Sequence, residues 1–113
     1  MLPLRLAVHN TTLPPADRAD IRRRVENLGR YFDRITNCRV TVAVPQRRRR
    51  TDHKLYAVRV ALTVPLGAIA IDRQPRRALK TALDEAFQAA RRRLQDHARR
   101  MREVHVRSER GRE

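Results

Sequence analysis

Apolar and polar residues alternate in four short segments of the chain, a pattern typical of strands that bury one face. These segments cover residues 4–8, 38–44, 56–64 and 69–71, and most of their apolar positions are Leu, Ile or Val. Pro45 follows the second segment and ends it. The turn sequence Pro65-Leu66-Gly67 separates the last two segments, which are therefore predicted to form a hairpin.

Two further segments repeat apolar residues every three or four positions, as amphipathic helices do. The first is predicted to begin at Pro14 and Pro15, with Thr11 or Thr12 near the capping position. Its apolar stripe consists of Ile21, Val25, Leu28 and Phe32. The second runs from residue 75 to about residue 103, and its stripe consists of Leu79, Leu83, Ala86, Phe87, Ala90, Leu94, Ala98 and Met101.

The order of these segments is β-α-β-β-β-α, and a chain of 113 residues suffices for a single domain. Each strand segment has one apolar and one polar face, which favours an antiparallel or mixed four-stranded sheet with both helices packed on one side. The predicted fold class is therefore α+β. Residues 1–103 are expected to form the domain. Residues 104–113 follow neither pattern and are expected to form a flexible basic tail.

The chain is strongly basic, because 27 Lys and Arg residues against 12 Asp and Glu residues give a net charge of +15. Such an excess opposes the compact state, and a polyanionic partner relieves the repulsion. A nucleic acid or a nucleoprotein is the favoured partner, and an acidic protein or a membrane surface is the alternative. The sequence has no apolar run of membrane-spanning length, and its single cysteine fits a reducing cytoplasm, where we expect the protein to reside.

The sequence shows no constellation of catalytic residues. Its four histidines are scattered and lack the spacing of metal ligands. Cys38 stands in register with three valines, so a packed core thiol is favoured over a nucleophile. Three glycines are too few for a phosphate-cradling loop. The protein is therefore predicted not to be an enzyme, and to use no cofactor, metal or small-molecule substrate.

Three groups of basic residues are candidates for binding a polyanion. The run at residues 47–50 lies in a predicted loop, where a solvated charge cluster is the simpler alternative. The triplets at residues 22–24 and 91–93 lie on the predicted helices, and their outward members, with Lys80 and Arg99, would form one basic surface. The exposed face of the sheet carries Arg5, Arg39 and Arg59 but no aromatic ring, so sequence-specific base reading there is not expected.

Several local patterns together, in their order and spacing, resemble the ribosome hibernation factor family, which includes hibernation-promoting factor and ribosome-associated inhibitor A. Residues 25–35, an apolar and spaced-basic stretch that closes on an aromatic pair, resemble the end of the family's first helix. Residues 54–60 and 64–67 resemble its third strand and the turn that follows, and residues 78–94 resemble its last helix. The resemblance covers about residues 4–103.

The resemblance implies the same β-α-β-β-β-α fold and binding to the small ribosomal subunit and its rRNA, in the channel that mRNA and tRNA use. By position, Arg24, Arg30 and Arg92 match basic residues that lie against rRNA in the family. Asn27 and Gln95 stand where basic residues are usual. Together with the candidates above, the predicted rRNA-binding set is Arg23, Arg24, Arg30, Arg47, Arg48, Arg49, Arg50, Lys80, Arg91, Arg92 and Arg99.

Three functions remain open on the sequence. The first is a ribosome-associated translation inhibitor or hibernation factor, monomeric when free, which blocks initiation by occupying the decoding channel. The second is a basic regulatory module that binds an acidic protein such as a transcription factor. The third is a chaperone that binds RNA or DNA non-specifically through the same basic face. Co-sedimentation with ribosomes distinguishes the three.

Overall fold

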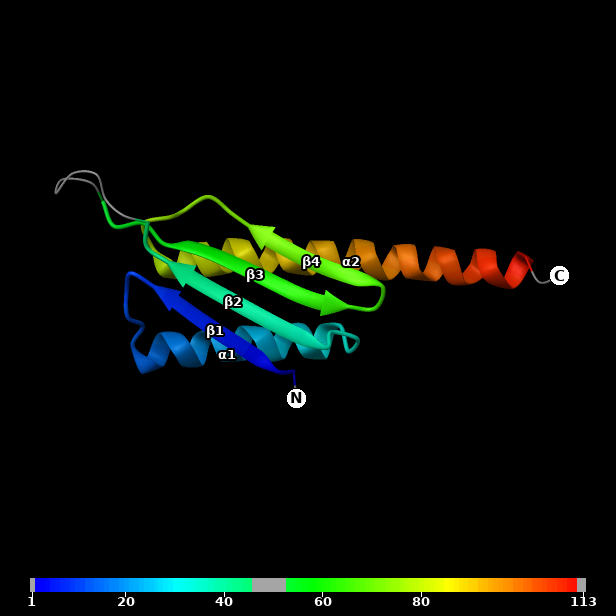
Figure 1. Ribbon diagram of the computed structural model, residues 1–113, viewed down its shortest axis with the longest axis horizontal. Helices are drawn as coiled ribbons and strands as arrows, with labels where there is room; N and C mark the ends of the chain where they lie inside the picture. Colours follow the sequence, from blue (N-terminus) through cyan, green and yellow to red (C-terminus); the bar gives the residue numbers. More distant parts are fainter. Residues whose placement is uncertain (1, 46–52, 112–113) are drawn as a thin grey trace.

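Four strands form one mixed sheet, which makes up one layer of the protein (Figure 1): β1 Leu4–His9, β2 Asn37–Ala43, β3 Ala57–Val64 and β4 Gly67–Asp72. The computed structural model describes residues 2–45 and 53–111. The strands lie in the order β1-β2-β3-β4. β1 pairs with β2 in parallel, and the other two pairings are antiparallel.

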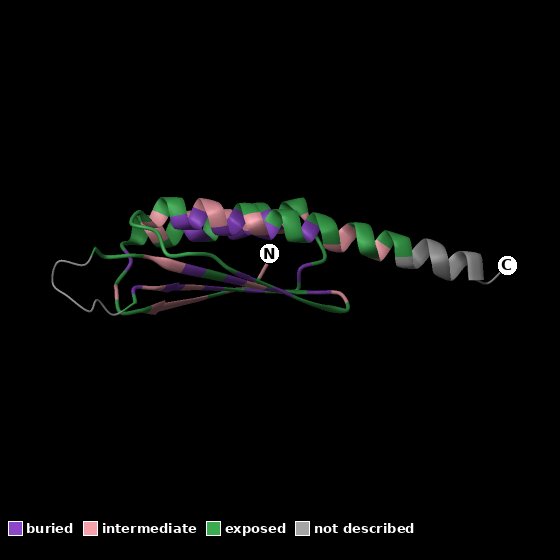
Figure 2. Cartoon of the chain, turned by 90° about the horizontal axis from the view of Figure 1, so that it is seen from above, coloured by how far each residue is buried: buried purple, intermediate pink, exposed green. Residues whose placement is uncertain are grey.

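Two helices, α1 Pro15–Tyr31 and α2 Leu79–Gly111, cover one face of this sheet (Figure 2). α1 is the crossover between β1 and β2, which their parallel pairing requires. Both helices run in the same direction, and the C-terminal part of α2 extends beyond the sheet (Figure 1). The element order and the placement of both helices on one side confirm the predicted α+β fold.

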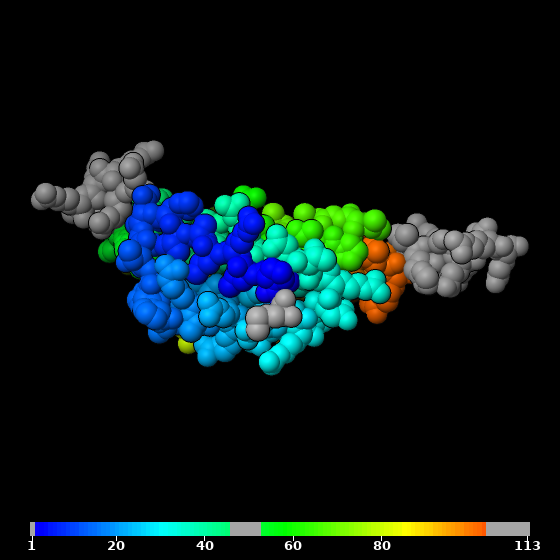
Figure 3. Space-filling model, turned by 60° about the horizontal axis from the view of Figure 1, so that its bottom comes forward, coloured from blue at the N-terminus to red at the C-terminus, as the bar shows by residue number. Residues whose placement is uncertain are grey.

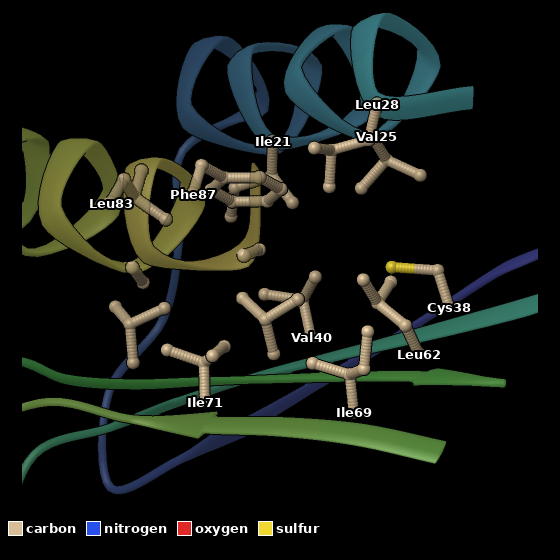
Figure 4. Packing of buried hydrophobic residues seen from close by; sticks show 14 of the residues in the cluster. Ile21, Val25, Leu28, Cys38, Val40, Leu62, Ile69, Ile71, Leu83 and Phe87 are labelled. Atoms are coloured by element: carbon tan, nitrogen blue, oxygen red, sulfur yellow. The ribbon is translucent and has the colours of Figure 1, made fainter. Parts of the chain in front are cut away.

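The hydrophobic core lies between the sheet and the helices, where the apolar stripes of the helices meet alternate residues of the strands (Figure 4). Full burial of one Val, Leu or Ile side chain contributes about 1.5–3 kcal/mol, so this layer fixes the rotation of each helix about its axis. The opposite side of each helix is thereby left to solvent or to a partner. The buried set includes Ile21, Val25, Leu28, Cys38, Val40, Leu62, Ile69, Ile71, Leu83 and Phe87.

The strand residues that point away from the helices form a second surface, which we call the open sheet face. Its arginines are Arg5, Arg39 and Arg59, and all three are exposed. Arg5 and Arg39 are direct neighbours in the register of β1 and β2. Arg59 is paired with Asp72, at 3.1 Å between Nη1 and Oδ2. The other residues of this face are mostly Ala and Thr, so the surface is flat.

The ends of the helices differ from the prediction at three points. α1 is capped by Pro14 without a side-chain hydrogen bond, so the expected capping role of Thr11 or Thr12 is wrong. α2 begins four residues after Pro75, because Arg76 exchanges two backbone hydrogen bonds with Tyr56 in an isolated β-bridge, just before the start of β3. It continues to Gly111, past the predicted end near residue 103, since residues 104–110 contain neither Gly nor Pro.

The turn between β3 and β4 contains an unusual leucine. Leu66 has a φ of 63°, in the left-handed region that favours glycine, and its side chain is 86% exposed. The left-handed conformation costs a residue with a Cβ about 1–2 kcal/mol. Neither the strain nor the exposure helps the isolated domain to fold.

Candidate functional site

A groove lies between α1 and α2, and one half-buried arginine joins the two helices across it. Arg24, on α1, lies with Nη1 2.6 Å from Oδ1 of Asp84 on α2, and with Nε 3.2 Å from Oδ2 of Asp20 on its own helix. Its side chain is 18% exposed. The guanidinium of Arg24 is therefore shared by two carboxylates and joins the helices.

Asp20 accepts hydrogen bonds from two arginines of α1, Arg24 and Arg23. Arg23 donates from Nη2 to Oδ1 of Asp20 at 2.8 Å. This hydrogen bond is the main cause that holds the pKa of Asp20 below its usual value, and the bond from Arg24 and the two nearby positive charges add to it against the cost of burial. Two carboxylates thus lie close to two cations at this end of the groove.

The other end of the groove is formed by an aromatic side chain. The guanidinium of Arg91 lies over the ring of Tyr31, 4.5 Å from its centroid, in cation–π geometry. The amide nitrogen of Gln95 donates to the Tyr31 hydroxyl at 2.5 Å. Tyr31 is 44% exposed, so its ring lies outside the buried core and is open to contact from Arg91. Sequence periodicity missed this contact because it depends on the spacing between the two helices.

The groove itself has a volume of about 570 Å³. Its floor is apolar, with Leu28 and Phe87, and its walls carry charged and amide groups. Asn27 and Gln95, which stand where the family usually has basic residues, lie in this region, Asn27 on the wall and Gln95 against Tyr31. Their side chains are uncharged, so the positive charge of the groove comes from the arginines of its lining, Arg24, Arg30 and Arg91.

The exposed cations lie on both helices, and Arg30 and Arg91 among them also line the groove. We define the helix-pair face by the exposed residues Arg23, Arg30, Lys80, Arg91, Arg92 and Arg99. Within the described part of the chain, all of them except Arg23 are without an ion-pair partner. At 100° per residue, the positions on α2 fall within one third of the helix circumference. The helix-pair face is therefore a basic surface on two rigid elements.

The predicted site residues divide into three groups. Six of them form the helix-pair face. Arg24 lies between the helices and is occupied by carboxylates, so its position is that of a structural cation. Residues 47–50 lie outside the described ranges, and their predicted role stays a prediction.

Other chemistry is limited in the described ranges. No group of three His, Cys, Asp or Glu side chains there is placed to hold a metal ion. Cys38 is fully buried, as predicted for a packed core thiol, and burial raises its pKa to about 12. A thiol with this pKa stays protonated at neutral pH and is a poor nucleophile. Neither described helix is long and apolar enough to cross a membrane.

Comparison with known proteins agrees with this architecture. A ribosomal subunit interface protein from Coxiella burnetii has a similar structure, with a TM-score of 0.72 and 11% identity over 86% of this chain and 98% of that one. The N-terminal domain of Protein Y from Thermus thermophilus aligns with a TM-score of 0.64 and 16% identity, over 86% of this chain and 99% of that domain. At these identities the likeness shows the fold.

The family is shown by the sequence match. No curated protein matches the chain. Residues 4–102, which include all four strands, α1 and α2 as far as residue 102, match the family described as Sigma 54 modulation protein / S30EA ribosomal protein. The chain therefore belongs to the Sigma 54 modulation protein / S30EA ribosomal protein family, the ribosome hibernation factors that its sequence resembles.

Proposed function

We propose that this chain is a ribosome-associated translation inhibitor that places its helix-pair face against the rRNA of the small subunit. It occupies the channel that mRNA and tRNA use, and so blocks initiation. The proposed location is the cytoplasm, where ribosomes work. No chemical step is needed, because a domain that fills this space stops translation as long as it remains bound.

The observation that carries the proposal is the exposed charge of the helix-pair face. Arg30, Arg92 and Arg99 are exposed and without a carboxylate partner in the described residues. They stand on helices that are fixed by the core, so little conformational entropy is lost when they meet phosphates. Each neutralised phosphate releases condensed counterions, which supplies much of the affinity.

Arg24 supports this surface in a different way. Because it neutralises Asp84 and Asp20, it removes negative charge from the groove that an approaching phosphate would meet. It also fixes the separation of the two helices. We therefore assign Arg24 as a positioning residue for the helix-pair face, in place of the direct rRNA contact expected from the family pattern.

The alternative function is a regulatory module that binds an acidic protein such as a transcription factor. It is kept because the family description also names sigma 54 modulation. The same helix-pair face would serve both partners, so the surface alone does not separate them. The salt dependence of binding separates the two partners. If binding neutralises six phosphates, the affinity for RNA falls on the order of a thousandfold when the salt concentration rises fourfold.

The test combines sedimentation with translation. Purified protein is mixed with ribosomes and separated on a sucrose gradient, and the same protein is titrated into a cell-free translation reaction. We expect co-migration with the small subunit, inhibition in proportion to the ribosome concentration, and relief when mRNA and initiator tRNA are bound first. Free protein in the gradient contradicts the proposal. Equal spread over all RNA fractions supports the non-specific chaperone, and cleaved rRNA reveals an enzyme.

A further inference from the structure

A second site lies where α2 leaves the sheet, next to the strained turn of the β3–β4 hairpin. Leu66 adopts a φ of 63° and exposes 86% of its side chain. Glycine would avoid the strain, and a polar residue would avoid the exposed apolar surface. A residue that is unfavourable on both counts in the free domain points to a contact outside it.

Beside this turn lies a notch of about 590 Å³. Its apolar wall comes from three separate segments, namely Phe32 after α1, Pro65 in the turn, and Ala98 with Met101 on α2. Figure 3 shows these segments meeting, with α2 in orange between the cyan chain after α1 and the green β3–β4 hairpin. We call Phe32, Pro65, Ala98 and Met101 of this wall, together with the exposed Leu66 that follows Pro65 in the turn, the apolar corner.

The wall of the notch is fixed before any ligand arrives. The ring nitrogen Nε2 of His97 lies 3.0 Å from the carbonyl oxygen of Pro65, which ties α2 to the turn. The ring of Phe32 meets the ring of His97 edge to face, with the centroids 6.4 Å apart and an angle of 73° between the planes. Because these contacts hold three segments together, the notch is a preorganised site.

The rim of the notch is basic. Arg34 and Arg102 line it from opposite elements, and Asp33 is the one acidic residue in its lining. In the described residues neither arginine forms an ion pair. An apolar wall beneath two free guanidinium groups suits a ligand that is flat and apolar at one end and anionic at the other.

We propose that the apolar corner binds one unstacked nucleobase of a single-stranded or bulged RNA, with the adjoining phosphate held by Arg34 and Arg102. Unstacked bases are the parts of RNA that proteins bind by stacking on aromatic and other flat side chains. This inference rests on the proposed function, because it assigns a specific contact to the RNA that the helix-pair face meets through charge. An apolar protein segment would leave both arginines without a counter-charge, which favours RNA.

The test uses a short RNA hairpin with one bulged 2-aminopurine, the same hairpin with an abasic bulge, and the fully paired hairpin. We expect the wild-type protein to bind the 2-aminopurine hairpin about tenfold more tightly than the abasic one, as stacking of a single base provides. The fluorescence of 2-aminopurine should change on binding. Equal affinity for the two bulged hairpins overturns the proposal.

Two variants connect this preference to the corner. Leu66→Gly removes the exposed side chain and relieves the left-handed strain, so its melting temperature should equal or exceed that of the wild type. Met101→Gln keeps the length of the side chain and makes the wall polar. In both variants the ratio of the affinity for the 2-aminopurine hairpin to the affinity for the abasic hairpin should fall to near one. The affinity for the fully paired hairpin should not change. Leu55→Ser, at another exposed leucine, is the matched control and should keep the full preference.

The result is separate from that of the proposed function. Base preference without ribosome binding would contradict the proposed function and leave the apolar corner as an RNA site. Ribosome binding that falls in Leu66→Gly, with no base preference in the wild type, would assign the corner to a ribosomal protein and overturn the inference. A preference that both variants retain would also overturn it.

Discussion

The helix-pair face and the open sheet face both expose arginines, yet they present them to a partner in different ways. On the sheet, Arg5 and Arg39 are neighbours on a flat surface of mostly small residues, and Arg59 forms an ion pair with Asp72. On the helices, the exposed cations flank a groove whose carboxylates are occupied by Arg24. Positive charge alone therefore does not define the candidate site. Arg5 and Arg39 also form no ion pair within the described residues, so the two surfaces differ in shape and in the internal neutralisation of their acidic groups.

The strongest test of this comparison removes equal charge from each face. The triple variant Arg30→Ser, Arg92→Ser and Arg99→Ser should lower ribosome affinity by about 100-fold, which is about 2.8 kcal/mol. Each lost phosphate contact should also reduce the slope of log affinity against log salt by about one. Binding is measured by co-sedimentation at several salt concentrations, and the unchanged fold by circular dichroism.

The matched control carries Arg5→Ser, Arg39→Ser and Arg59→Ser, which removes three charges from the open sheet face. We expect less than about a fivefold loss of affinity, because long-range attraction is reduced but no rRNA contact is broken. If the two triple variants lose affinity equally, net charge governs binding and the proposed orientation is wrong. If the sheet variant is worse, the partner lies on the open sheet face.

The basic run at residues 47–50 provides an intermediate case. Replacing the four arginines with Ser removes more charge than either triple variant, but we expect about a tenfold loss of affinity, mainly through slower association. Stopped-flow kinetics would show a lower association rate with little change in the dissociation rate. A faster dissociation rate would instead place this run in the bound interface.

A substitution at Arg24 tests whether this cation supports ribosome binding indirectly, by holding the two helices together. The variant Arg24→Gln leaves Asp84 and Asp20 without their shared partner, and should lower the free energy of unfolding by about 1 kcal/mol, given the partial exposure of the pairs. Ribosome affinity should fall less than in the triple helix variant once the folded fraction is taken into account. Urea unfolding and co-sedimentation measure the two effects. A full loss of affinity in a folded variant would restore Arg24 as a direct contact.

The smallest expected effect is on acid stability. Since the pKa of Asp20 is lower in the folded than in the unfolded protein, its ionised form stabilises the fold above the unfolded pKa. This contribution is lost as the pH falls below 3.8, the ordinary pKa of an aspartate side chain, and through the lower pKa of the folded protein. Asp20→Asn should lose less stability than the wild type over this range in urea titrations. An equal loss would show that other carboxylates account for the acid response.

Much of the fold followed from residue patterns, because a strand or helix with one buried face carries its own periodicity. The alternation at Cys38 and Val40 and the stripe through Ile21 and Val25 each report burial locally. The parallel pairing of β1 with β2 was left open, since periodicity within a strand says nothing of its direction beside a neighbour. The start of α2 was misplaced because a backbone bridge to Tyr56 competes with helix formation.

Less of the candidate site than of the fold could be predicted from the sequence. The exposed cations on the helices were found, because their positions on one helix follow from 100° per residue. The pairing of Arg24 with Asp84 and the contact of Arg91 with Tyr31 were missed. These contacts depend on the distance and rotation between α1 and α2, which two separate periodicities do not define. The strain at Leu66 depends on the backbone of one turn and has no counterpart in a hydropathy pattern.

The parallel pairing of β1 with β2 has a consequence for the order of folding. β3 and β4 are joined by two residues, Pro65 and Leu66, whereas β1 reaches β2 only after residues 10–36 have formed a crossover. Because the entropy cost of closing a loop grows with its length, we expect the β2-β3-β4 meander and α2 to assemble first and α1 to dock last. α1 carries Arg23 and Arg30, so an incompletely folded chain would hold only the α2 half of the helix-pair face. The chain would then acquire its affinity for the proposed partner in the last folding step, and only fully folded molecules would bind that partner.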